Sequence, residues 1–350
     1  WRLKMKRFLT LVLAMAMTLS LAACGGSSNS SDSKEPAQNT DSSDTNASDT
    51  NSSIDPTALY AIGGGATGGT FNAMGSTFTQ FFNDGKVYGQ FSSTATTGGV
   101  QNIMFMQNGT CDFGIISLSV LVDAIDGTNA FDGNPYEDVK VITPLYNAYF
   151  QQFCTKDIKS EADLRGKKLV VGGPGSGDEA TAKQIYGLMG MTFDDFDPQY
   201  LGSNEGIEAM KDGHADGAIA VTQLPFSSFL ELTNAEKAYL MPLSQETIDK
   251  ACEPGDHSIP VWFRATIPAN TYKTQPEDIA TIAQGSYLCC RGDLSDELVY
   301  ELTKYIWENI GDLNMLHAAL ANLTIDDVKD CADLPIHPGA LKYYQEQGIL

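Results

Sequence analysis

A glycine-rich loop at residues 63–70 is the first stretch of the sequence that could do chemistry. It reads Gly-Gly-Gly-Ala-Thr-Gly-Gly-Thr and follows the apolar run 59–62, which is typical of a β-strand. Apolar residues then recur at helical spacing over 71–82, so the loop joins a strand to a helix. The first turn of a helix has unpaired N–H groups that favour an anion, and glycine lets the anion approach the backbone. We expect an anionic ligand to contact Thr67, Gly68, Gly69 and Thr70.

Two further loops have the same character. Residues 94–99 read Thr-Ala-Thr-Thr-Gly-Gly and follow the strand-like run 88–93, while residues 172–177 read Gly-Gly-Pro-Gly-Ser-Gly and follow the run 168–171. A helical pattern comes after each loop, as it does after the first. The loops predict further ligand contacts at Thr97, Gly98, Gly99, Gly175, Ser176 and Gly177.

Three other polar residues lie at or near the ends of strand-like runs. Ser117 ends the run 111–117, Gln223 closely follows the run 215–221, and Tyr146 follows the run 139–145. Ser117 and Gln223 occupy equivalent places in the chain, so each could reach a ligand from its own side. Tyr146 could form a wall of the site or donate a hydrogen bond. The alternative for all of these residues is a role in turns and caps without a ligand.

The order of strand, loop, helix and strand occurs twice, and this repeat predicts two α/β domains with a parallel sheet in each. Ligands of such sheets bind outside the carboxyl ends of the strands, so a solute would lie in a cleft between the domains. Helices are expected at 296–310 and 339–347, packed back on the first domain. We assign 55–150 and 263–350 to domain I, and 151–262 to domain II.

The first 54 residues are expected to be a leader and a tether. Residues 1–23 have basic, then apolar, then small residues, which is the layout of a secretory signal peptide. The motif Leu-Ala-Ala-Cys at 21–24 resembles the bacterial lipobox, in which the cysteine is acylated. Residues 24–54 therefore predict a lipidated Cys24 and a polar, disordered linker. A cleaved soluble precursor and an uncleaved anchor are the alternatives.

Composition narrows the possible partners. The formal net charge is −22 over 350 residues, and a nucleic-acid-binding domain would need a basic face, so we expect no nucleic acid. Beyond Cys24 the chain has six cysteines, whose pairing the sequence leaves open. Cys111 and Cys154 lie in apolar runs and are expected to be buried thiols. No Cys-x-x-Cys spacing occurs, so no metal site and no cofactor are expected.

The sequence has partial matches to the motifs of two classes of enzyme, dehydrogenases and hydrolases. Gly63, Gly65 and Gly68, with Asp84, fit the dinucleotide fingerprint, but the export signal and the loop at 172–177 argue against a dehydrogenase. A hydrolase would need G-x-S-x-G, and Pro174 stands where Ser176 would require the first glycine. We therefore expect no catalytic residues.

The sequence resembles the TAXI class of solute receptors of tripartite ATP-independent periplasmic (TRAP) transporters. The resemblance is carried by stretches that span nearly the whole folded region: 64–75, 97–117, 164–185, 200–221, 267–272 and 334–340. It implies a periplasmic-binding-protein-like (type II) fold that closes on a small anionic solute, a carboxylate or an amino acid such as glutamate. It also implies a monomeric receptor that passes the solute to TRAP membrane subunits. A receptor-like lipoprotein used for sensing or adhesion is the alternative.

Overall fold

The computed structural model describes residues 54–350, except for residues 56, 87, 254 and 256. All of these residues belong to one compact unit, Ser52–Leu350. The expected signal peptide, Cys24 and the linker up to residue 53 lie outside the described residues. Within the described part, no helix is both long and apolar enough for a membrane span.

One mixed sheet of ten strands organises the described chain. Eight strands form the path β2-β1-β3-β10-β4-β7-β5-β6, while β8 pairs with β4 and β9 pairs with β10. The strands are β1 (Leu59–Gly63), β2 (Gln90–Thr94), β3 (Phe113–Ser117), β4 (Val139–Cys154), β5 (Lys168–Val170), β6 (Asp197–Gln199), β7 (Gly217–Thr222), β8 (Tyr239–Met241), β9 (Phe263–Ile267) and β10 (Ile279–Arg291).

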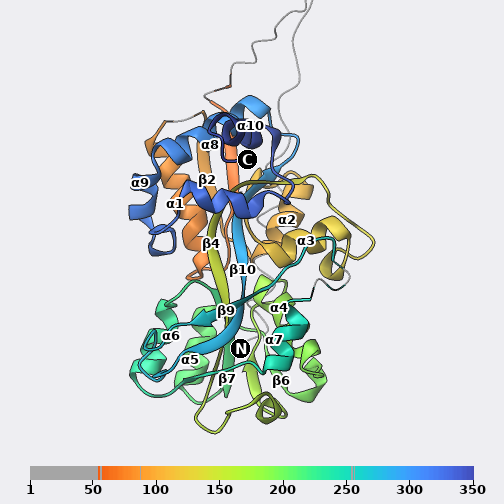
Figure 1. Ribbon diagram of the computed structural model, residues 1–350, viewed down its shortest axis with the longest axis vertical. Coiled ribbons are helices and arrows are strands. Elements are labelled where there is room, and N and C mark those ends of the chain that lie inside the picture. The colour runs from red at the N-terminus through yellow and green to blue at the C-terminus, as the bar shows by residue number, and fades with distance from the viewer. Residues whose placement is uncertain (1–53, 56, 87, 254, 256) are drawn as a thin grey trace, which may run out of the picture. The chain divides into compact units, whose positions relative to one another are not determined.

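The sheet contains the predicted repeat. Strand β1 pairs in parallel with β2 and β3, and β5 pairs in parallel with β6 and β7. The long strands β4 and β10 lie antiparallel to each other and join these two halves (Figure 1). We call β1–β3 with their helices the first lobe, and β5–β8 with theirs the second lobe.

The expectation of two separate parallel sheets was wrong, and the strand that includes the run 139–145 continues beyond Tyr146. β4 is one strand of 16 residues. The polar stretch Tyr146-Asn147 interrupts the apolar pattern, but it stays extended because β10 pairs with it: Tyr146 is opposite Ser286, and Asn147 is opposite Gly285. The partner strand begins more than 130 residues later in the chain, so local pattern could not reveal this pairing.

Helices cover both lobes (Figure 1). The first lobe carries α1 (Thr70–Asp84), α2 (Gly99–Gln107), α3 (Leu118–Asp126), α8 (Asp296–Glu308), α9 (Ile310–Leu316) and α10 (Pro338–Glu346). The second lobe carries α4 (Gly177–Leu188), α5 (Ser203–Lys211), α6 (Ser227–Asn234) and α7 (Gln245–Ala251). Short 3-10 helices are η1 (Asn129–Phe131), η2 (Glu161–Leu164), η3 (Phe193–Asp195), η4 (Ala318–Leu320) and η5 (Ile325–Cys331).

Apolar packing fixes the directions of the helices that approach the site. Met74, Phe78 and Phe82 recur at helical spacing on α1 and are fully buried, in a cluster that also holds Phe113 of β3. Each such phenylalanine contributes about 1.5–3 kcal/mol by leaving water. The helix expected after the first glycine loop is thus confirmed, and its N-terminus is held at the edge of the sheet.

The assigned domain limits cross continuous elements. Residue 150 lies inside β4, and Ile267 and Tyr272 pack in the cluster of Phe153 and Phe229, in the second lobe. Tyr272 Oη also donates a hydrogen bond to Gln151. The assigned limits stay a proposal.

The six cysteines of the described part are free thiols. Cys111 and Cys154 are fully buried, which confirms the expectation for these two. Burial raises the pKa of the Cys154 thiol to about 12. Such a thiol stays protonated and behaves as a small apolar group.

Candidate functional site

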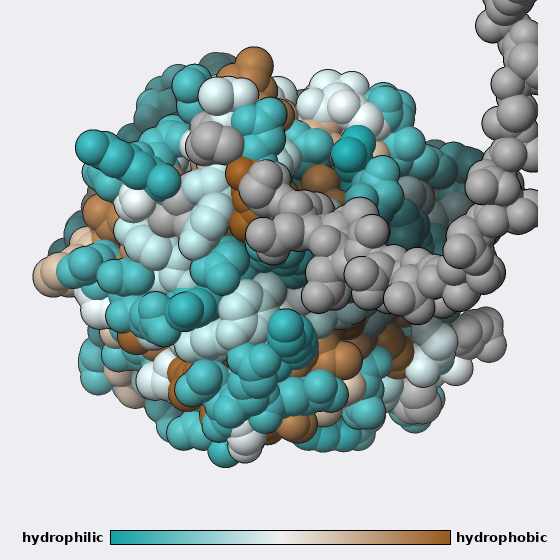
Figure 2. Space-filling model, turned by 90° about the horizontal axis from the view of Figure 1, so that it is seen from above, coloured by the Kyte–Doolittle hydropathy of each residue, from teal (hydrophilic) through white to brown (hydrophobic). Residues whose placement is uncertain are grey.

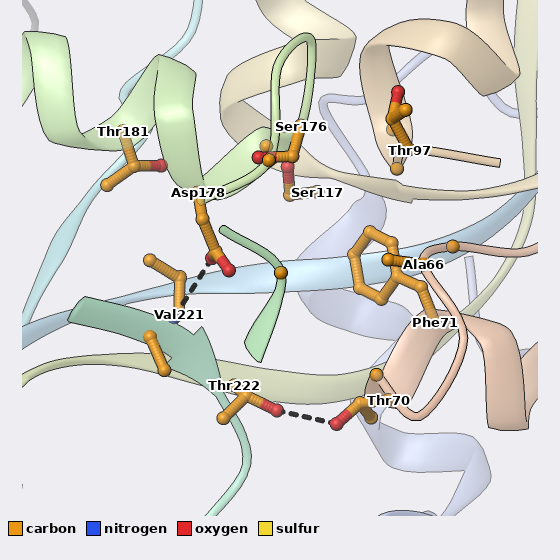
Figure 3. A pocket seen from close by; sticks show the side chains of 18 of the residues that line it. Ala66, Thr70, Phe71, Thr97, Ser117, Ser176, Asp178, Thr181, Val221 and Thr222 are labelled. Carbon is orange, nitrogen blue, oxygen red and sulfur yellow. Dashed lines mark hydrogen bonds between the residues drawn. The ribbon is translucent and has the colours of Figure 1, made fainter. Parts of the chain in front are cut away.

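A cavity of about 90 Å³ lies between the lobes, where several of the expected loops meet (Figure 3). At roughly 10–15 Å³ for each water-sized group, it holds on the order of six to nine such groups. That is the size of a small amino acid or organic acid rather than of a nucleotide. The cavity therefore has room for a small solute.

Five helices begin at this cavity. Their N-cap residues all line it: Gly69 for α1, Gly98 for α2, Ser117 for α3, Ser176 for α4 and Gly202 for α5. No side chain caps the first turn of α1. A helix N-terminus carries N–H groups without intrahelical partners and the positive end of its dipole. In α3 and α4 one such group is already bonded to a side chain: Ser119 N to Gln284, and Glu179 N to Ser176. Among the described lining residues there is no Lys, Arg or His, so an anion here would be held by backbone dipoles.

The two lobes touch at the rim of the cavity. The hydroxyl oxygens of Thr70 and Thr222 lie 2.9 Å apart, the contact drawn as a dashed line in Figure 3. Thr97 Oγ1 donates a 3.3 Å hydrogen bond to the carbonyl oxygen of Gly175. These contacts join the first lobe to the second beside the cavity.

The structure brings together nine of the thirteen residues expected from the sequence. Those that line the cavity are Gly69, Thr70, Thr97, Gly98, Gly99, Ser117, Tyr146, Ser176 and Gly177. They come from both lobes and from five separate stretches of chain. Their contact with a ligand stays a prediction.

The other four expected residues do not line this cavity, because each loop turns away at one end. Thr67 is exposed, and Gly68 has a φ of +83° and faces Asn204 of α5 so closely that a Cβ would overlap its amide. Gly175 offers its carbonyl oxygen to the other lobe instead of an N–H to the cavity. Gln223 Oε1 accepts a hydrogen bond from its neighbour Thr222 and lines a second cavity.

Sequence reasoning missed Asp178, the second residue of α4. Its carboxyl group points into the cavity and accepts a 3.2 Å hydrogen bond from the backbone N–H of Val221 (Figure 3). Asp178 keeps some accessible surface where it lines the cavity, but protein surrounds it, and this burial raises the pKa of its carboxyl to about 6. An acid directly after the Gly-Ser-Gly of a predicted ligand loop was the available signal.

Gln284 of β10 was also missed. Its Oε1 accepts a 2.7 Å hydrogen bond from Ser119 N in the first turn of α3, which identifies the other atom of the amide as Nε2. Gln284 Nε2 is buried and has no acceptor among the described residues. No local pattern could connect Gln284 to the loops, because it reaches the site only through the pairing of β10.

Tyr146 likewise has a buried hydroxyl without a hydrogen-bond partner in the described part. It lies near the hydroxyls of Ser286 and Thr222, but hydrogen-bond geometry is met with neither. Burial raises its pKa, so the phenol keeps its proton. Unpartnered buried donors are rare in folded proteins, and an acceptor supplied by a ligand would explain the two on this wall.

A second cavity, of about 310 Å³, shares Tyr146 with the first. Residues of β4, β10, η4 and η5 line it, and Gln223, Ser286, Asp327 and Asp330 are among its polar groups. Within the described residues, no group of three or more His, Cys, Asp or Glu could hold a metal ion.

Comparison with known protein families shows to which family the chain belongs. Residues 62–348 match the model of the NMT1-like family, which is most of the sequence. The chain belongs to the NMT1-like family. The match begins in β1 and ends after α10, so it includes every element that lines the site.

Solved structures show what fold this NMT1-like chain has. A periplasmic transporter is 12% identical, with 83% of this chain and 97% of that chain covered and a TM-score of 0.51. A Prochlorococcus marinus protein solved with methylphosphonate is 10% identical over 85% and 100% of the two chains, with a TM-score of 0.48. A TRAP solute-binding protein from a Sulfitobacter species, with bound β-D-galacturonate, is 15% identical over 83% and 96%, with a TM-score of 0.43. The predicted α/β, periplasmic-binding-protein-like fold is confirmed.

Proposed function

We propose that the protein is an extracytoplasmic receptor that captures a small organic acid or amino acid, such as glutamate, between its two lobes. One observation carries this proposal: five helix N-termini meet at one cavity, whose described lining has no cationic side chain. Donors of this kind suit carboxylate oxygens, and hydrogen bonds to a charged group contribute about 1.5–3 kcal/mol each. The cavity's small volume favours a metabolite of about ten heavy atoms or fewer.

Capture works by closure of the lobes. N-caps of the first lobe, such as Gly69 and Gly98, and N-caps of the second lobe, such as Ser176 and Gly202, face the same space. A ligand that contacts both sets stabilises the closed state, since only a difference in affinity between two states can shift their populations. Thr70 and Thr222 then close the rim.

The finer assignment rests on the sequence. The stretches that resemble the TAXI class support delivery of the solute to the membrane subunits of a TRAP transporter. The lipobox at 21–24 supports anchoring to the cell membrane through acylated Cys24, and more than one acyl chain would make that attachment stable.

The test is a panel of amino acids and dicarboxylates, each at millimolar concentration, scored by the melting temperature of the purified protein. A ligand that binds only the folded state raises that temperature. At a concentration of a hundred times its dissociation constant, it adds about 2.7 kcal/mol to the free energy of unfolding. We expect one compound class to raise it and to be recovered unchanged. A panel without any shift would argue against the proposed function.

A further inference from the structure

The cavity contains a single carboxylate among its described lining residues, that of Asp178. One oxygen of Asp178 accepts a hydrogen bond from Val221 N, and no described residue donates to the other. The acid next to it in sequence is arranged differently: Glu179 pairs with Lys183 at 2.7 Å and accepts a hydrogen bond from Gly175 N at 2.6 Å. Asp178 therefore lacks the cation that its neighbour has.

An enclosed carboxylate without a counter-charge is costly, and in folded proteins such groups pair with a cation or take up a proton. The raised pKa of Asp178 has burial as its main cause, and no charged group contributes to it. A cation within about 4–6 Å would reverse that effect. Because the described cavity wall has no cationic side chain, such a cation would have to come with the ligand.

The opposite side of the cavity suits a negative charge. Figure 3 shows Asp178 and Thr181 on one side, with Ala66, Phe71 and Thr97 on the other. The N-termini of α1 and α2 lie with the second group, at Gly69 and Gly98. The buried, unpartnered Nε2 of Gln284 adds a donor to the same cavity. The site thus offers separate places for a positive and a negative group.

We infer that the solute is a zwitterionic amino acid, whose ammonium group lies against Asp178 and whose carboxylate lies against the N-termini of α1 and α2. This rests on the proposed function and narrows its substrate class. A carboxylic acid of the same shape without the amino group leaves Asp178 unpaired, so it binds only when Asp178 is protonated. Asp178 is then the residue that selects between the two classes.

The first experiment uses pairs of ligands that differ mainly in the amino group: L-alanine and propionate, L-aspartate and succinate, L-glutamate and glutarate. Calorimetric titration of the purified protein at pH 7 should give tighter binding of the amino acid in at least one pair. Asp178→Asn should weaken the affinity for that amino acid by about 30-fold or more, which is the scale for removing one partner of a buried charge pair. Glu179→Gln, the same chemical change one residue away, should alter the affinity less than about threefold, because Glu179 does not line the cavity.

The second readout needs no variant and decides the matter if Asp178→Asn does not fold. With Asp178 titrating at about 6 in the free protein, the affinity for an amino acid should fall about tenfold between pH 7 and pH 5. The affinity for a deaminated acid should rise over the same range. Binding of the amino acid should release protons, and binding of the deaminated acid should take them up.

Tighter binding of the deaminated acids at pH 7, or an amino-acid affinity that Asp178→Asn leaves unchanged, would overturn the inference. The proposed function would survive either result, since an anion would still have been captured. Absence of binding by both ligand classes at both pH values would overturn the inference and the proposed function together.

Discussion

At the scale of the residue, the site depends on groups that the fold leaves without partners. Gln284 uses one side of its amide to hold the first turn of α3 and leaves the other side free. Tyr146 and Asp178 also face the cavity with unused hydrogen-bonding capacity. Such groups lower the stability of the empty protein, and a ligand that pairs with them regains that free energy on binding.

Tyr146→Phe tests this for one donor. The change should leave the free energy of unfolding of the empty protein unchanged within about 0.5 kcal/mol, because the hydroxyl has no partner to lose. It should weaken the affinity for the best ligand by about tenfold or more, which corresponds to the loss of one hydrogen bond to a charged group. Urea denaturation and calorimetric titration measure the two effects.

Tyr344→Phe is the matched control. The Tyr344 hydroxyl donates a 2.6 Å hydrogen bond to the carbonyl oxygen of Ile142 and accepts one of 3.0 Å from Trp307 Nε1. Its removal should cost about 1–3 kcal/mol of stability without changing affinity. A Tyr146 variant that loses as much stability as the Tyr344 variant would show that Tyr146 has a structural partner.

The pH dependence of stability tests Asp178. Its folded-state pKa of about 6 lies above the ordinary value of 3.8, so its contribution to stability is fully present below pH 4 and is lost as the pH rises through 6. The loss amounts to at most about 3 kcal/mol above pH 7, at about 1.4 kcal/mol for each pKa unit. Asp178→Asn should therefore stabilise the empty protein at pH 7.5 and have little effect at pH 4. Equal effects of the substitution at both pH values, measured by urea denaturation, would contradict this.

At the scale of the element, the sequence predicted the strand-loop-helix units and their repetition. The apolar spacing of α1 and the glycine loops before α1, α2 and α4 were sufficient, because these signals are local. Which loop residues face the cavity was not predictable from them. Gly68 and Gly69 are neighbours in sequence, yet only Gly69 lines the cavity, since the chain turns over between them.

Long-range pairing was the other limit. β10 supplies Gln284 to the wall, and its pairing with β4 holds Tyr146 in place. Both contacts join segments more than 130 residues apart, and no periodicity in one segment encodes the register of the other. Asp178 differs in this respect, because its position after the third loop was visible and only its burial was not.

Gly68→Ala tests the contact between the first loop and α5. Gly68 has a φ of +83°, and a side chain there would meet the Asn204 amide across the rim. The variant should reduce the affinity for the ligand by about tenfold, because closure is hindered, with about 1–2 kcal/mol of local strain in the first lobe.

Gly133→Ala separates the two effects. Gly133 has a similar φ of +72°, but no atom lies within 4 Å of the position of a Cβ. This variant carries the backbone strain without the clash, so it should lose stability and keep its affinity. Equal affinities of the Gly68 and Gly133 variants would remove the first loop from the closing contact.

At the scale of the whole molecule, a formal net charge of −22 accompanies a cavity that we propose binds an anion. The charge resides on a surface where, on the face shown in Figure 2, hydrophobic residues stand in small groups among hydrophilic ones. Exposed charges are screened by water and salt over about 8–10 Å, whereas helix N-termini act at contact distance inside the cavity. Local dipoles therefore decide what binds.

On the proposed function, binding of the solute requires the two lobes to close, which is a motion of the whole molecule. Thr70→Val removes the hydroxyl that meets Thr222 across the rim, while the size of the side chain is kept. The variant should weaken the affinity for the ligand by about two- to tenfold, because one hydrogen bond contributes about 0.5–1.5 kcal/mol. Unchanged affinity in calorimetric titration would mean that this contact does not contribute to the closed state.

The central claim is that helix N-termini hold the acidic group of a solute in the cavity between the lobes. A crystal structure of the protein with the best ligand of the panel tests it most directly. We predict one molecule in this cavity, with its carboxylate oxygens about 2.7–2.9 Å from first-turn backbone nitrogens of α1 or α2. A ligand bound elsewhere, or one whose carboxylate contacts none of the five helix N-termini, would contradict the account.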